Sequence, residues 1–367
     1  MAPTDNRGED ETDIASSQYS PEGMATSPRF LYSASMTANA GTSAPVLVLM
    51  PLYNDWESVR ALLPQLDAAL ASSQIKARLL IVDDGSSEPC PSGLVAAPLS
   101  AIGQVDLLQL RRNLGHQRAI AIGLAHAAQE IACEAVVVMD SDGEDLPADV
   151  PRLIQAMRDQ ARPTVVFAQR TRRSEDWLFK LFYWGYRMLH LVLTGIRVRV
   201  GNFSALPAQL LQKLVVSSEL WNHFAAAIFR LRLPFAEIAT RRGKRLAGRS
   251  RMNFVALVTH GLSALSVFGD IVGVRLLIAS ALVMALALAG LLSVVAIRLS
   301  TDLAIPGWAS VLGAVCVLVI LQGAAIAALF VFIVLSSRSN LGFLPLRDHR
   351  YFVQQCSSVW PVSADER

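Results

Sequence analysis

Three carboxylates at alternate positions follow one apolar run and are the first candidates for chemistry. Residues 136–139 read Val-Val-Val-Met, and Asp140, Asp142 and Glu144 come directly after them. An apolar, β-branched run that ends in acids and Gly143 predicts a buried strand followed by a tight turn. In an extended segment, residues two apart point to the same side, so we expect Asp140 and Asp142 to share one side. Carboxylate oxygens at the end of a rigid strand suit Mg²⁺ or Mn²⁺, which usually also bind phosphate oxygens.

A solvated acidic turn is the alternative, and for an isolated Asp-x-Asp pair it would be the favoured one. The surrounding chain argues for a site instead. Apolar strands are expected near 46–50, 78–82, 105–110 and 164–169, and amphipathic helices alternate with them. This alternation predicts an α/β domain with a parallel sheet, and ligands bind such sheets outside the carboxyl ends of the strands. Polar side chains gather at those ends, among them Tyr53, Asn54, Asp55, Asp83, Asp84 and Arg170.

Neither of the common glycine-rich phosphate loops is present. The sequence contains no dinucleotide fingerprint Gly-x-Gly-x-x-Gly and no P-loop. Any phosphate in the site must therefore be held by a metal ion and by arginines.

The composition points to a domain attached to a membrane. The 367 residues are 53% hydrophobic and 17% charged, which is too apolar for an ordinary soluble protein. The four cysteines are far apart, without the spacing of a metal site or a disulfide framework, which fits a reducing cytosolic compartment. Residues 1–43 are rich in small and polar residues, and we expect a disordered tail.

Two long apolar stretches predict the membrane attachment. Residues 271–299 and 308–335 each exceed the roughly 20 residues that a transmembrane helix requires. Basic residues flank the pair on its outer sides, so the positive-inside rule places the α/β domain and both termini in the cytosol. We expect a multi-pass protein of the cell (inner) membrane. The aromatic and cationic segment 171–194 and the segment 243–270 predict helices lying in the membrane interface, and 336–367 a cytosolic tail.

An ordered set of short motifs resembles the family-2 glycosyltransferases, in particular their polyprenyl-phosphate branch. Membrane helices follow the motifs in both cases. The resemblance implies that residues 44–242 form a GT-A (Rossmann-like) domain with a UDP- or GDP-linked sugar donor and a polyprenyl phosphate acceptor. The motifs are Pro51-Leu52-Tyr53-Asn54, Val82-Asp83-Asp84-Gly85-Ser86, Arg112-Asn113-Leu114-Gly115-His116, Asp140-Ser141-Asp142, Gly201-Asn202-Phe203-Ser204 and Arg245-Leu246-Ala247-Gly248-Arg249-Ser250-Arg251.

The resemblance also implies roles for individual residues. Two departures from the family matter: Glu144 stands where a Gln is common, and Ser250-Arg251 replaces a common Ser-Lys. We expect Asp142 and Glu144 to bind Mg²⁺ or Mn²⁺. The remaining expected site residues are Pro51, Tyr53, Asp55 and Asp84 for the base and ribose, Asp140 and Ser141 for the nucleotide sugar, and Arg170, Arg245 and Arg251 for phosphates.

The implied reaction needs little proton chemistry. A phosphate monoester is already anionic at neutral pH, so no general base is required, and the family implies inversion at the anomeric carbon. His116 fits a contact with the donor and a structural place at a helix end equally well. The alternatives are a processive polysaccharide synthase and a non-catalytic glycosyltransferase-like membrane protein. Nucleic-acid binding is not expected, and the sequence leaves homo-oligomerisation open.

Overall fold

A mixed eight-stranded sheet forms the centre of the part of the chain that the structure describes. The computed structural model describes residues 44–170, 185, 188–195, 200–247, 254–301, 307–339 and 342–361. Within them the strand order is β7-β5-β6-β4-β1-β2-β3-β8. The strands are β1 Val46–Leu52, β2 Ala77–Asp83, β3 Ile102–Leu110, β4 Ala135–Val138, β5 Val165–Arg170, β6 Ser204–Pro207, β7 Phe235–Thr240 and β8 Val353–Trp360.

The middle of the sheet is parallel, as predicted. β1 pairs in parallel with β2 and with β4, and β2 pairs in parallel with β3. β6 and β8 run antiparallel to their neighbours β4 and β3. Every residue of β1 is buried, which explains its continuous apolar sequence, because a parallel strand is covered on both faces. The predicted α/β class is confirmed.

Helices cover both faces of the sheet. The side chains of Val46 and Val48 belong to one core cluster, with helices α1 (Trp56–Ser72) and α3 (Asp149–Arg158). Leu47 and Leu49 belong to the other, with helix α2 (His116–Glu130). Successive residues of a strand point to opposite faces, so one apolar strand supplies both cores. The shorter elements α5 (Ala208–Leu214), η1 (Ser218–Trp221) and α6 (Phe224–Arg230) extend the second core.

The strand order changes direction at β1. From β1 the chain moves outward through β2 and β3, and then returns to the other side of β1 as β4. Such a reversal of strand order is where open α/β sheets bind ligands, at the carboxyl ends of the strands. The loops after β1 and β4 are therefore the expected walls of a site.

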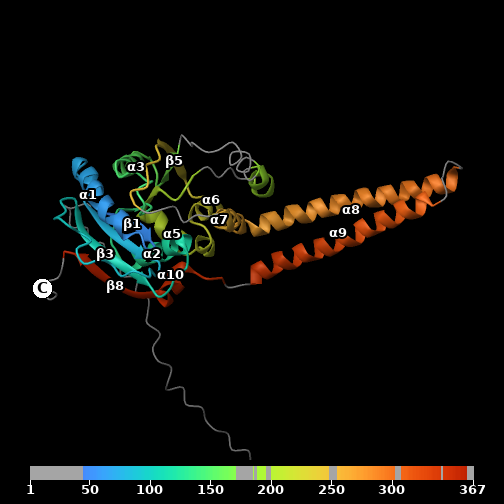
Figure 1. The fold of residues 1–367 in the computed structure, drawn as a ribbon. Helices are drawn as coiled ribbons and strands as arrows, with labels where there is room; N and C mark the ends of the chain where they lie inside the picture. Colours follow the sequence, from blue (N-terminus) through green and yellow to red (C-terminus); the bar gives the residue numbers. More distant parts are fainter. Residues whose placement is uncertain are drawn as a thin grey trace, which may run out of the picture. The chain divides into compact units, whose positions relative to one another are not determined.

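Two long helices follow the short helix α7 (Phe254–Ser266). α8 (Gly269–Ser300) and α9 (Trp308–Ser339) lie side by side (Figure 1), and both are long and apolar enough to cross a membrane. The start of α8 is joined to the α/β domain: Phe268 is buried beside Ala226, and Arg230 pairs with Asp270 at 2.7 Å. Most of the predicted interfacial segment 171–194 lies outside the described residues. The part of it that is described, residues 188–194, is helical.

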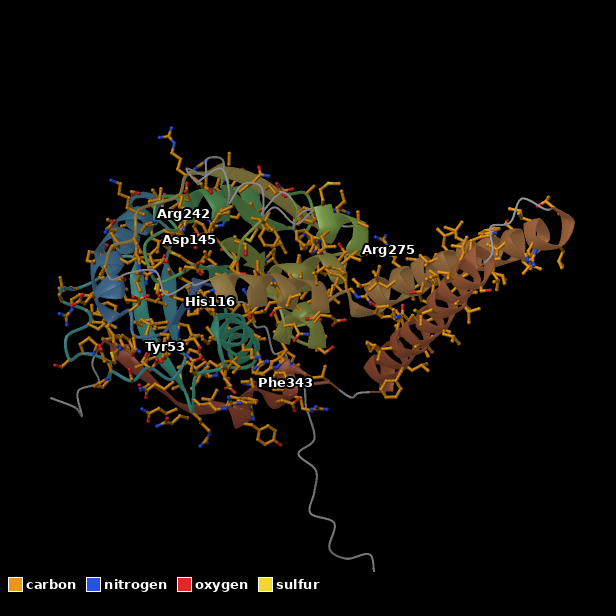
Figure 2. The ribbon with its side chains drawn as sticks, turned by 45° about the vertical axis from the view of Figure 1, so that its right-hand side comes forward. Tyr53, His116, Asp145, Arg242, Arg275 and Phe343 are labelled. Atoms are coloured by element: carbon orange, nitrogen blue, oxygen red, sulfur yellow. The ribbon has the colours of Figure 1, made fainter. Side chains whose placement is uncertain are left out.

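The C-terminal segment differs from the expected tail. After α10 (Pro345–Asp348) and η2 (His349–Tyr351), β8 pairs antiparallel with β3 and completes the sheet. Phe343, labelled in Figure 2, stacks on Trp221 with ring centroids 3.8 Å apart. β8 was not predicted because an edge strand is half exposed, and its Gln and Ser residues give no buried-strand pattern.

Candidate active site

The loop after β1 supplies the first side of the site. Pro51 is buried within β1, Tyr53 is 39% exposed, and Asn54 has a left-handed backbone with φ +56°. Asp55 stands at the N-cap position of α1, where a carboxylate usually accepts a backbone N–H of the helix. Among the described residues the Asp55 side chain makes no capping hydrogen bond with α1 and pairs with Arg245 instead.

The acidic turn after β4 supplies the opposite side. β4 ends at Val138, so the carboxylates lie in a turn and not in an extended strand. The expectation that Asp140 and Asp142 point to one side of an extended strand was therefore wrong, because the strand ends before them. The two side chains have different partners. Asp142 pairs with Arg245, whereas Asp140 lies 3.2 Å from His116. The turn is closed internally because the Glu144 N–H donates to Asp142 Oδ1 at 2.9 Å.

Arg245 connects the two sides. Its Nη2 lies 2.5 Å from Asp55 Oδ2, and its Nη1 lies 3.1 Å from Asp142 Oδ2. Burial raises the pKa of Asp142, and the neighbouring carboxylates Asp140 and Glu144 raise it further, while Arg245 acts in the opposite direction. Two partly buried carboxylates facing one another thus stabilise positive charge between them.

The loop after β7 packs over the acidic turn. The Gly243 N–H donates to the Glu144 carbonyl at 2.8 Å, and the Leu246 N–H donates to the Asp142 carbonyl at 3.0 Å. Gly143 has φ +84°, and a Cβ there would lie 2.5 Å from the Leu246 side chain. Only a glycine allows this approach, because other residues carry a Cβ and disfavour positive φ.

Arg242 of the same loop is engaged with Glu144. Its Nη2 lies 2.6 Å from Glu144 Oε2. Figure 2 labels Arg242 together with Asp145, whose Oδ2 accepts the Asp140 N–H at 3.0 Å. The structure thus pairs the two expected metal ligands with two different arginines, and Glu144 could reach a metal only after leaving Arg242.

The two carboxylates at the carboxyl end of β2, Asp83 and Asp84, organise the neighbouring loops. Asp83 Oδ1 accepts the Ser86 N–H at 2.9 Å and so supports the turn that follows the strand. Asp84 is 3% exposed, and its two oxygens accept the N–H groups of Leu114 and Gly115 at 2.7 and 2.8 Å. Burial raises the pKa of Asp84 to about 6, although these two hydrogen bonds lower it. Asp84 therefore fixes the start of α2.

His116 and Asn202 bring three of the sequence motifs together. The His116 Nε2 lies 3.2 Å from Asp140 Oδ1 and 3.1 Å from Asn202 Nδ2, and Asn202 Oδ1 accepts from Gln117 at 3.1 Å. Burial lowers the pKa of His116, but the carboxylates around it, Asp140 foremost, outweigh this effect and raise the pKa. Asn202 and Gln117 were not among the predicted site residues, although both lie in or beside the motifs that carried the resemblance.

Of the three remaining predicted residues, only Ser141 has a side chain within the described part of the chain. Ser141 is 6% exposed within the acidic turn. Arg170 ends β5, where its backbone is in register with Thr240, but its side chain lies outside the part that is described. Arg251 lies entirely outside the described residues.

The described residues contain no group of three or more His, Cys, Asp or Glu side chains arranged to hold a metal ion. They do contain Asp142, which lies in the turn after β4 and whose carboxylate already pairs with the guanidinium of Arg245. Mg²⁺ is typically bound by one or two carboxylates together with substrate phosphates and water. The arrangement can therefore hold a metal–phosphate complex, and among the described residues it cannot form an all-protein metal cage.

Comparison with known proteins found a matching family and several similar proteins. The family described as "Glycosyl transferase family 2" matches residues 47–215. The undecaprenyl-phosphate 4-deoxy-4-formamido-L-arabinose transferase of Erwinia tasmaniensis is 26% identical over 258 residues, which cover 66% of this chain and 77% of that protein. The transferase of the same name from Enterobacter sp. is 27% identical, covering 62% of this chain and 72% of that protein.

A solved structure is also similar. The glucosyl-3-phosphoglycerate synthase of Mycobacterium tuberculosis, in complex with Mn²⁺ and UDP-glucose, is 16% identical with a TM-score of 0.45, covering 63% of this chain and 79% of that one. The family match spans β1 to the end of α5 and includes the loop after β1 and the acidic turn. The chain therefore carries a glycosyltransferase family 2 domain and is a glycosyltransferase.

Proposed function

We propose that the protein transfers a sugar from a nucleotide-diphosphate donor to a polyprenyl phosphate at the cytosolic face of a membrane. The observation that carries the proposal is the cluster of Asp55, Arg245 and Asp142 at the reversal of the sheet. It combines carboxylates for a metal–diphosphate complex with a guanidinium for phosphate. The two relatives, which are named as acting on undecaprenyl phosphate, support the choice of a lipid phosphate as acceptor.

The membrane arrangement follows from the lipid acceptor. A polyprenyl tail stays in the bilayer, so the site must lie near the interface, and α8 and α9 are proposed to anchor it as two membrane spans. The ion pair between Arg230 of α6 and Asp270 of α8 would hold the domain to that anchor.

The metal is proposed to be Mg²⁺ or Mn²⁺, bound by Asp142 with the diphosphate of the donor. When bound, it would stabilise the negative charge of the departing nucleoside diphosphate. Asp55 and Tyr53 would contact the nucleoside, and Asp84 would support this pocket through Leu114 and Gly115. The acceptor phosphate would be the nucleophile, with inversion at the anomeric carbon.

Arginines are proposed to collect the phosphates. Arg245 would exchange a carboxylate for a phosphate, since a guanidinium binds both through the same fork of N–H groups. Arg170 and Arg251 are proposed to assist, on the resemblance alone.

A lipid-labelling experiment tests the proposal. Purified protein in undecaprenyl-phosphate vesicles with Mg²⁺ is given radiolabelled UDP-glucose, UDP-N-acetylglucosamine, GDP-mannose or UDP-4-deoxy-4-formamido-L-arabinose, and the lipid is extracted. Label in the lipid with one donor, and none without undecaprenyl phosphate, is the expected result. Release of free sugar, growth of a polymer, or the absence of label in the lipid with every donor would contradict the proposal.

A further inference from the structure

We propose that Asn54 is the positioning residue of the nucleoside subsite, where it fastens the loop after β1 to the loop after β2. The inference rests on the proposed function and adds to it a residue whose side chain need not touch the donor. Its expected effect is to hold Tyr53 and Asp55, the two neighbours of Asn54, in place for donor binding.

The Asn54 side chain is bound to the second loop at three points. Its Oδ1 accepts the N–H groups of Ser87 and Glu88 at 2.9 and 3.2 Å, and its Nδ2 donates to Ser87 Oγ at 3.0 Å. The Asn54 N–H donates to Ser86 Oγ at 2.9 Å. One side chain and its own amide thus connect two loops that are more than 30 positions apart in sequence.

A second contact reinforces the connection. Trp56, which is 5% exposed, donates its indole N–H to the Glu88 carbonyl at 3.0 Å. The loop after β2 is itself fixed by Asp83 and Asp84, which bind Ser86 and the start of α2. Asn54 therefore ties Tyr53 and Asp55 to a loop that buried carboxylates hold against the sheet.

The backbone of Asn54 has a positive φ, which is uncommon for residues other than glycine. It has φ +56°, a left-handed conformation that Asn adopts more readily than most residues. Gln74 also has a positive φ, but it follows the C-terminal end of α1, where such a residue commonly ends a helix. Asn54 precedes a helix, so the ending of a helix does not explain its positive φ. We infer that the hydrogen bonds to Ser86, Ser87 and Glu88 hold this conformation.

The neighbouring Asp55 shows what this conformation achieves. Asp55 occupies the N-cap position of α1, yet its carboxylate is directed to Arg245 and not to the helix. Giving up a capping bond leaves a backbone N–H at the start of the helix without its usual acceptor and so destabilises the helix end. Departures of this kind concentrate at functional sites, where another part of the structure maintains them. The anchored Asn54 is the residue placed to maintain this one.

Nucleotide binding tests the inference on the full-length protein in detergent. UDP and, separately, GDP are titrated with Mg²⁺ into the wild type and into Asn54→Ala, Asn54→Gly and Asn54→Asp. We expect Asn54→Ala to weaken the nucleotide that the wild type binds by about tenfold, because two backbone N–H groups lose their acceptor. The KM for the donor should rise by the same factor, while the KM for the lipid phosphate stays within about twofold of the wild type.

The other variants separate the side chain from the backbone conformation. Asn54→Gly permits the left-handed backbone but lacks the hydrogen bonds, so it should bind as weakly as Asn54→Ala. Asn54→Asp keeps an acceptor for the Ser87 and Glu88 N–H groups and should restore binding to within about threefold. Gln74→Ala, at the other left-handed site beside α1, should bind as the wild type does.

Each contrary result has a distinct meaning. Wild-type affinity in Asn54→Gly, or in all three Asn54 variants, would overturn the inference. If Asn54→Ala does not fold, Ser86→Ala removes one bond of the same connection, and unchanged nucleotide affinity in it and in Asn54→Gly would overturn the inference equally. A wild type that binds neither UDP nor GDP would contradict the proposed function itself.

Discussion

The guanidinium of Arg245 lies 2.5 Å from the carboxylate of Asp55, although 190 positions separate the two residues in the sequence. The contact joins the loop after β1 to the loop after β7, and a second nitrogen of the same guanidinium reaches Asp142 in the acidic turn. Three segments that are remote in the chain thus meet on one cation.

Arg245 and Asp55 should be energetically coupled. Asp55→Asn and Arg245→Ala should each lower the stability of the protein, and the double variant should lose less than the sum. We expect a coupling of about 1–3 kcal/mol from thermal unfolding, because both side chains are only one-fifth exposed. The exposed pair Arg158–Glu134, 2.7 Å apart, is the matched control and should give about 0.5 kcal/mol or less. Equal coupling energies in the two pairs would show that the Arg245–Asp55 contact stabilises the protein no more than an exposed ion pair does.

Asp142 should be indispensable for transfer but not for folding. Asp142→Asn keeps the shape of the side chain and removes the charge that would bind the metal–diphosphate complex. We expect kcat to fall by about 100-fold or more, while the protein still folds cooperatively and inserts into the membrane. Asp159→Asn, at the end of α3, is the control for a carboxylate outside the site. Full turnover by Asp142→Asn in a purified assay would remove Asp142 from the mechanism.

Gly143 should tolerate no side chain, for two separable reasons. Alanine there would have an unfavourable positive φ, and its Cβ would lie 2.5 Å from the Leu246 side chain. We expect Gly143→Ala to lower activity about tenfold or more by displacing the loop that carries Arg245. Adding Leu246→Ala should recover part of the loss.

Gly93 is the control for Gly143. Its φ is +77°, but no atom of the described residues lies within 4 Å of the point that an added Cβ would occupy. Gly93→Ala therefore tests the cost of the backbone conformation alone. Equal losses of activity in Gly93→Ala and Gly143→Ala would show that the contact with Leu246 has no importance.

Asp84 should make stability depend on pH in an unusual direction. Its pKa is raised from 3.8 to about 6, so the folded state binds a proton more tightly than the unfolded chain does. The stability contributed by Asp84 is therefore fully present below about pH 4 and decreases as the pH rises through about 6. The difference in unfolding midpoint between the wild type and Asp84→Asn should decrease over that interval.

Asp67 provides the opposite case for comparison. Burial would raise its pKa, but hydrogen bonds from Ser100, Ile102 and Ala101 prevail and lower it. Its contribution is present above the pKa of the unfolded side chain and is lost as the pH falls. The difference between the wild type and Asp67→Asn should therefore decrease toward acid. A decrease in the same direction for both variants would contradict the assignment of Asp84.

The α/β class, the two long apolar helices and the motifs at the strand ends could all be predicted from the sequence. These features follow from local rules: buried parallel strands are continuously apolar, helices show their own period, and turn residues mark the ends. β8 could not be predicted, because an exposed edge strand carries no such pattern. Its place in the sheet depends on its pairing with β3, which is distant in the chain.

Which charges meet could be seen only in the folded protein. Spacing suggested that Asp140 and Asp142 act together with Glu144, but the fold gives them three different cationic or polar partners: His116, Arg245 and Arg242. Partner choice between side chains depends on distances across loops that are far apart in sequence, and no local period encodes those distances. The role of Asn54 became visible for the same reason, because its significance lies in the loop that it holds.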